Sequence, residues 1–144
     1  FAFTVQEEVG LRGARTAAFG LNADVGIALD VTATGDAPRN AKMDIKLGGG
    51  AAIKIHDTAL VVQPAIRDWM IARAEADGIP YQRELLTLGS TDAAAIQLTG
   101  SGVLSGAISI PCRFLHTTSE TVDLNDVEAC VKLLVGLTGN AITI

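Results

Sequence analysis

Short apolar segments alternate along the chain with segments whose apolar residues recur at helical spacing, and few architectures accommodate that order. Apolar runs predict strands at residues 1–6, 25–31, 51–55, 81–88 and 104–115, and helical periodicity predicts helices at residues 11–20, 64–78, 91–98 and after Asp123. Alternating strands and helices build a layered sheet with helices on its faces. We therefore expect an α/β fold. A length of 144 residues corresponds to one domain or part of one.

Local signals refine two of these elements. Asp123 can cap the last helix. The apolar stripe of that helix comprises Val127, Cys130, Val131, Leu134 and Val135. Pro111 interrupts the apolar run at residues 104–115, which predicts an edge strand or a bulge at that point.

Charge and composition narrow the partners and the compartment. A formal net charge of −5 at pH 7 disfavours nucleic acid and anionic membranes and suits a metal cation. The longest uncharged stretch, residues 93–112, is interrupted by glycines, polar residues and a proline, so it does not predict a membrane span. Cys112 and Cys130 lie in apolar segments, which indicates reduced core thiols in a cytoplasmic protein.

The first residues have the character of a buried strand. The chain opens on FAFTV at residues 1–5, without a preceding turn, helix cap or initiator methionine. It does not open with the basic and then apolar segments that are typical of a secretory leader. We therefore expect the chain to begin within a longer protein.

Ionisable residues follow three of the predicted strands. Glu7 and Glu8 come after the first strand and before a glycine turn, Asp30 ends the second apolar run, and His116 follows the last. Because ligands of open α/β sheets collect outside the carboxyl ends of strands, we expect these side chains to meet in one pocket. Carboxylates and an imidazole suit zinc, cobalt or manganese, and their negative charges would repel one another without a cation. The sequence therefore predicts a divalent metal site assembled from distant segments.

Each of these residues also has a structural interpretation. Glu7 and Glu8 would stabilise the start of a helix, Asp30 would serve a turn, and His116 would be a core or loop histidine. His56 follows a glycine-rich loop and an apolar run, and we favour a structural role for it at the start of a turn.

Other catalytic schemes lack their motifs in the sequence. There is no Gly-x-Ser-x-Gly elbow and no His-Glu-x-x-His or Cys-x-x-Cys pair. Cys112 is close to His116 in sequence but lies in an apolar segment, where a buried, inert thiol is expected. The glycines at residues 48–50 could cradle a phosphate, but no Gly-Lys-Ser/Thr follows, and Lys54 is in the wrong register for a P-loop.

Several motifs in a fixed order carry a resemblance to one family. They are TVQEEVGLRGA at residues 4–14, ALDVT at 28–32, AIKIHD at 52–57, STDA at 90–93, IPCRFLH at 110–116, and Glu120. Over nearly its whole length the chain resembles the dinuclear metal aminopeptidases, which include glutamyl aminopeptidase, the tetrahedral aminopeptidases and members labelled as endoglucanases. It departs from the family pattern at Ser90, where relatives commonly have Gly, and at Phe114, where they have Tyr.

The resemblance implies a role for each candidate residue. Glu7 would be the general base, Glu8 and His116 would bind one of two divalent ions, zinc or cobalt, and Asp30 would bind the other. The implied reaction is hydrolysis of the N-terminal residue of a peptide by a metal-activated water. Relatives also form homo-oligomers, so the resemblance implies an oligomeric protein.

The resemblance further implies that residues 1–144 are the C-terminal portion of a zinc-peptidase-like catalytic domain. Relatives carry another His ligand and a bridging Asp before the Glu pair, together with an inserted β domain, and this sequence has none of these. We therefore expect these 144 residues alone to bind metal poorly and to show almost no activity. Two other functions stay open, an endoglucanase-type glycoside hydrolase and a non-catalytic assembly domain.

Overall fold

A computed structural model describes residues 1–38 and 42–142 of the chain. In chain order the elements are α1 (Arg12–Leu21), β1 (Val25–Ala33), β2 (Ala51–His56), α2 (Pro64–Ala76), β3 (Tyr81–Leu85), α3 (Asp92–Gln97), β4 (Leu104–Arg113), β5 (Thr121–Val122) and α4 (Leu124–Gly139). The predicted alternation and the layered α/β class are confirmed. Within the described residues, we find no helix with both the length and the hydropathy that a membrane span requires.

The strands form one mixed sheet in the order β1-β4-β2-β3, with β5 paired to β4. β1 runs parallel to β4, β2 runs parallel to β3, and β2 is antiparallel to β4. Because β1 and β4 are parallel, their carboxyl ends lie at the same edge of the sheet. The turn that carries His116 therefore leaves the sheet at the carboxyl end of β1, the strand that contains Asp30.

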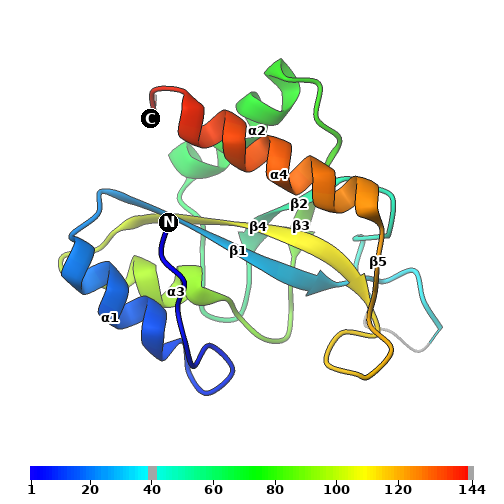
Figure 1. The fold of residues 1–144 in the computed structure, drawn as a ribbon, viewed down its shortest axis with the longest axis horizontal. Helices are drawn as coiled ribbons and strands as arrows, with labels where there is room; N and C mark the ends of the chain where they lie inside the picture. The colour runs from blue at the N-terminus through cyan, green and yellow to red at the C-terminus, as the bar shows by residue number, and fades with distance from the viewer. Residues whose placement is uncertain (39–41, 143–144) are drawn as a thin grey trace.

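Helices cover both faces of the sheet, with α2 and α4 on one face and α1 and α3 on the other (Figure 1). Two glycines allow this close packing. A Cβ on Gly106 of β4 would lie 2.7 Å from the Met70 Sδ of α2, and one on Gly26 of β1 would lie 2.5 Å from Ile96 Cγ2 of α3. Both distances are too short for a side chain, so these positions require glycine for helix–sheet contact.

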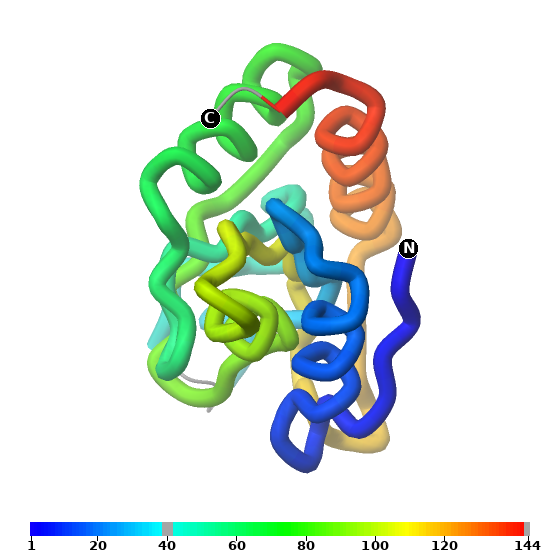
Figure 2. Tube along the Cα trace, turned by 90° about the vertical axis from the view of Figure 1, so that its left-hand side faces the viewer, coloured from blue at the N-terminus to red at the C-terminus, as the bar shows by residue number. Residues whose placement is uncertain are grey.

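The strand predicted at residues 1–6 is wrong. This segment is irregular, and its Phe1 and Phe3 side chains are 100% and 97% exposed. A strand exists only through hydrogen bonds to a neighbour, and none of the described strands pairs with this segment. Figure 2 shows it alongside α1, at the side of the molecule away from α2.

The last helix is also buried differently from its apolar stripe. Its core-facing side comprises Asp126, Ala129, Cys130, Leu133 and Leu137. Cys130 of the predicted stripe is buried, but Val131 and Val135 are 52% and 63% exposed. Two of the five stripe residues therefore point away from the part of the sheet that the described residues form.

Pro111 lies in a central strand rather than at an edge or a bulge, contrary to the prediction. β4 pairs continuously with β1, and Pro111 itself is opposite Thr32. On its other side β4 pairs with β2 up to Ser109 and with β5 from Cys112 onward. A residue without an N–H is tolerated where the partner strand changes.

The glycine loop at residues 48–50 binds a carboxylate of the same chain. The N–H groups of Gly48 and Gly50 donate to Asp126 Oδ2 and Oδ1 at 2.8 and 2.7 Å. Asp126 is buried in the first turn of α4. The loop therefore fixes the start of α4 against the sheet, with a side-chain anion where a P-loop would hold a phosphate.

We expect Gly50→Ala to lower the free energy of unfolding by about 2 kcal/mol or more. Gly50 has a φ of 91°, and an added Cβ would lie 2.1 Å from the Pro80 carbonyl oxygen. The matched control is Gly20→Ala in α1, where a Cβ meets nothing within 4 Å, and this change is expected to be neutral or stabilising. Urea unfolding of the two variants checks this, and equal midpoints would contradict it.

Candidate metal centre

Glu7 and Glu8 lie on a tight turn between the N-terminal segment and α1. The N–H groups of Gly10 and Leu11 donate to the Glu7 carbonyl at 3.1 and 2.9 Å, and Leu11 has a left-handed φ of 55°. The first turn of α1 reads Arg-Gly-Ala-Arg, so the glutamates precede the helix. The alternative interpretation of the pair as helix-stabilising charges in that first turn is therefore wrong.

Two contacts hold the segment that carries Glu7. Thr4 Oγ1 donates to Asp92 Oδ2 of α3 at 2.6 Å. A Cβ on Gly13 of α1 would lie 2.5 Å from the Val5 backbone, so the helix packs directly against this segment. The irregular N-terminal residues are thus attached to both helices on this face of the sheet.

His116 lies on the turn after β4, opposite Glu8. Phe114 and His116 have left-handed φ values of 58° and 62°, and the His116 N–H donates to Glu120 Oε1 at 2.6 Å. His116 Nε2 lies 3.3 Å from Glu8 Oε1, and both side chains are largely exposed. The structure therefore brings together two of the residues that the sequence predicts as metal ligands, 108 positions apart in the chain.

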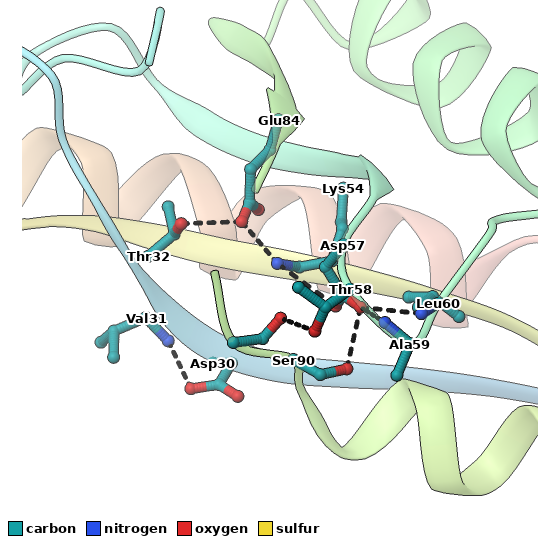
Figure 3. Close-up of polar contacts among 11 residues, drawn as sticks. Asp30, Val31, Thr32, Lys54, Asp57, Thr58, Ala59, Leu60, Glu84 and Ser90 are labelled. Carbon is teal, nitrogen blue, oxygen red and sulfur yellow. Dashed lines mark hydrogen bonds and ion pairs between the residues drawn. The ribbon is translucent and has the colours of Figure 1, made fainter. Parts of the chain in front are cut away.

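Asp30 lies inside β1, so its interpretation as a turn residue is wrong. Its Oδ1 accepts a hydrogen bond from the Val31 N–H at 2.7 Å (Figure 3). Burial raises the pKa of the Asp30 carboxyl, while the Val31 N–H and the Lys54 ammonium lower it.

Glu7 experiences the charges of the other predicted site residues. Its pKa is raised first by burial, then by the carboxylates of Asp30, Glu8 and Asp92, while His116 lowers it. Like charges raise a carboxyl pKa only when they lie nearby. Glu7 is thus within electrostatic reach of all three predicted metal ligands.

These residues do not form a complete metal site within the described part of the chain. Among residues 1–38 and 42–142, no group of three or more His, Cys, Asp or Glu side chains is arranged to hold an ion. Glu8 and His116 form a pair, and Asp30 does not join it. Carboxylate oxygens and an imidazole nitrogen suit zinc or cobalt, but two ligands fall short of the three that catalytic zinc sites take from the protein.

Neither cysteine has the character of a nucleophile. Cys112 and Cys130 are both free and buried. Burial raises the pKa of the Cys112 thiol, and it raises that of Cys130 to about 12. A neutral, buried thiol is a poor nucleophile, so the expectation of inert core thiols is confirmed.

A buried polar network, which the sequence analysis missed, lies beside Asp30 (Figure 3). Lys54 of β2 is fully buried, with its Nζ 2.5 Å from Glu84 Oε1 of β3 and 3.7 Å from Asp57 Oδ2. Glu84 Oε1 also accepts a hydrogen bond from Thr32 Oγ1 of β1 at 2.7 Å. The signal was a lysine between two isoleucines in the apolar run AAIKIH, because such a lysine is buried only with an anionic partner.

His56 has the structural place that the sequence favours. It is the last residue of β2, and the turn that follows is held by Asp57. Asp57 Oδ1 accepts hydrogen bonds from the N–H groups of Ala59 and Leu60 at 2.9 and 2.7 Å.

The fold is shared with solved aminopeptidases. An aminopeptidase from the archaeon Desulfurococcus kamchatkensis superposes with a TM-score of 0.92 at 42% identity, over 96% of this chain and 40% of that one. A Pyrococcus horikoshii TET1 peptidase, described as assembling into a tetrahedron or a large octahedral shell, matches with a TM-score of 0.80 at 36% identity, over 94% of this chain and 39% of that one. A Thermotoga maritima protein described as an endoglucanase superposes with a TM-score of 0.70 at 30% sequence identity, over 94% of this chain and 38% of that one. The architecture is therefore that of an aminopeptidase-type α/β domain.

The sequence identifies the family. The M42 glutamyl aminopeptidase family matches residues 1–133, so the chain belongs to this family. A putative aminopeptidase from Acetivibrio thermocellus is 50% identical over 135 residues, which are 94% of this chain and 41% of the relative. The chain thus spans about two-fifths of the length of such relatives.

We expect Lys54→Met to lower the free energy of unfolding by about 3–5 kcal/mol, because two buried carboxylates lose their cation. The matched control is Lys132→Met, which breaks the exposed Lys132–Glu128 pair on α4 and should leave stability nearly unchanged. Urea unfolding at neutral pH checks both. Equally small effects of the two substitutions would contradict the importance of the buried pair.

Proposed function

We propose that this chain is the C-terminal portion of the catalytic domain of a metal-dependent aminopeptidase. The observation that carries the proposal is the 3.3 Å approach of His116 Nε2 to Glu8 Oε1, next to Glu7. Membership of the M42 family supports peptide hydrolysis as the reaction. Because the chain spans only part of its relatives, the activity belongs to the longer protein in which these residues occur.

In this proposal Glu8 and His116 bind one divalent ion, zinc or cobalt, and Asp30 binds a second. Burial raises the pKa of Glu7 most, and the carboxylates of Asp30, Glu8 and Asp92 raise it further; this crowding of negative charge supports a cation at this position. When bound there, two such ions would lower the pKa of a water molecule and polarise the scissile carbonyl.

Glu7 acts as the general base. Its carboxylate takes a proton from the attacking water and returns it to the leaving amine. A free amine at the N-terminus of a peptide would ligate one of the ions, which would restrict cleavage to the first residue.

We further propose that another part of the catalytic domain covers exposed apolar side chains of this chain and supplies the missing ligands, a His and a bridging Asp. The exposed apolar side chains available for this contact include Phe1, Phe3, Leu29, Val31, Leu124, Val131 and Val135. Leu29 and Val31 belong to β1, which among the described strands has a neighbour on one side only. An exposed strand edge and an exposed helix face both require cover in a stable domain.

Assembly and location follow from the same proposal. The shells described for the Pyrococcus horikoshii TET1 peptidase support a homo-oligomeric protein. Two free, buried thiols support a reducing compartment, the cytoplasm.

For the 144-residue chain alone, we predict negligible hydrolysis of aminoacyl-p-nitroanilides and weak binding of Zn²⁺ or Co²⁺ by titration calorimetry. A pair of protein ligands does not hold a catalytic ion, whereas three or more do. The longer protein is the positive control. Parent-like rates from the short chain would contradict its incompleteness.

For the longer protein, we predict that Glu7→Gln lowers kcat by about 10²–10⁴-fold, because the amide cannot accept the proton. The bound metal content should stay unchanged, whereas His116→Ala should lose metal. Activity should disappear with a chelator and return with Zn²⁺ or Co²⁺. Unchanged turnover in Glu7→Gln would favour a non-catalytic domain, and chelator-resistant cleavage of carboxymethylcellulose would favour a glycoside hydrolase.

A further inference from the structure

Lys54 is the one cationic side chain that is buried in the part of the chain that the structure describes. Its ammonium lies between the Glu84 and Asp57 carboxylates, both of which are also buried (Figure 3). Ion pairs in a low-dielectric interior are held in one geometry because every alternative leaves a charge unpaired. The position of Lys54 is therefore fixed more strictly than that of a surface lysine.

One arm of contacts leads from Lys54 to Asp30. Glu84 Oε1 contacts Lys54 Nζ and also accepts the Thr32 hydroxyl at 2.7 Å. Thr32 is two residues from Asp30, so both side chains project from the same face of β1. Since β1 and β3 are at opposite ends of the strand order β1-β4-β2-β3, this contact ties the outer strand β1 across the sheet.

A second arm leads from Lys54 to the segment that carries Glu7. Asp57 Oδ2 lies 3.7 Å from Lys54 Nζ, and Asp57 Oδ1 accepts the Ser90 hydroxyl at 2.8 Å. Ser90 is two residues before Asp92, whose Oδ2 accepts the Thr4 hydroxyl at 2.6 Å. Thr4 is three residues before Glu7 in the chain.

We propose that Lys54 is a positioning residue that sets the spacing between Asp30 and Glu7, through Glu84 and Thr32 on one side and through Asp57 and Ser90 on the other. The inference rests on the proposed function, which makes Asp30 a metal ligand and Glu7 the base. Two metals and a base require carboxylates held to within a fraction of an ångström, and neither a free-edged strand nor an irregular segment provides that alone. The two arms supply it before any ion binds.

Thr32→Val tests the first arm, because it removes the hydroxyl and keeps both the shape and the ion pair. The readout is amide hydrogen exchange of Val31, whose N–H donates to the Asp30 carboxylate. We expect this exchange to accelerate about tenfold, as for the loss of a hydrogen bond to a charged group. Thr32→Ser, which retains the hydroxyl, should restore slow exchange.

Ser90→Ala tests the second arm by the same method. Here the exchange of the Leu11 and Gly13 amides, which donate to the Glu7 and Val5 carbonyls, should accelerate while Val31 stays unchanged. The double variant Lys54→Met/Glu84→Gln should accelerate exchange at both places. Thr99→Val is the control, since the buried Thr99 hydroxyl bonds to Ala95 in α3 and lies outside both arms.

A purely structural role would give a different pattern. Amide hydrogen exchange in Thr32→Val would then accelerate uniformly over β1, α2 and α4, and the urea midpoint would fall. Either this result or unchanged exchange at Val31 would overturn the proposal. In the longer protein, Thr32→Val should weaken Co²⁺ binding about tenfold while Thr32→Ser does not. If the predicted exchange pattern appears but Glu7→Gln retains full turnover, the proposed function is wrong. The role of Lys54 in fixing the positions of Asp30 and Glu7 is then still supported.

Discussion

The parallel pairing of β1 with β4 holds the two strands in one register from Val25 opposite Leu104 to Ala33 opposite Cys112. Every feature of the candidate site depends on that register. It sends the turn that carries His116 out of the same edge of the sheet as Asp30, and it leaves room for α1 and α3 beneath β1 and β4 (Figure 1). The turn with Glu7 and Glu8 then reaches the site from α1, and Glu8 meets His116 there.

The sequence was sufficient for those parts of the fold that local pattern determines. Alternating periodicity predicted the four helices and the strands β1 to β4. Glu8 does approach His116, but the prediction placed Glu8 at the end of a strand, and the structure places it on a turn before α1. The sequence pattern failed at residues 1–6, because an apolar run becomes a strand only when another strand lies beside it. The predicted stripe on α4 was wrong at two of its five residues, because Val131 and Val135 are exposed and no described element packs over them.

The polar network was missed for a different reason. Lysine is among the least buried residue types, so a pattern-based analysis assigns Lys54 to the surface even in a run of isoleucine and alanine. Its partners, Asp57, Glu84 and Thr32, come from other elements, and only the fold brings them within contact distance. Spacing along the chain contains no signal for such a convergence.

Among the described strands, β1 has a neighbour on one side only, and this affects how such a protein folds during synthesis. Backbone donors and acceptors along an uncovered strand are a template on which any extended segment, including one from a neighbouring copy, can add. In the proposed longer protein these residues are synthesised after the segment that covers them, and β1 exposes that template, together with Leu29 and Val31, until it pairs with that segment. Rapid closure by the correct segment would then compete with aggregation, so the order in which the segments of the domain emerge bears directly on the yield of native protein.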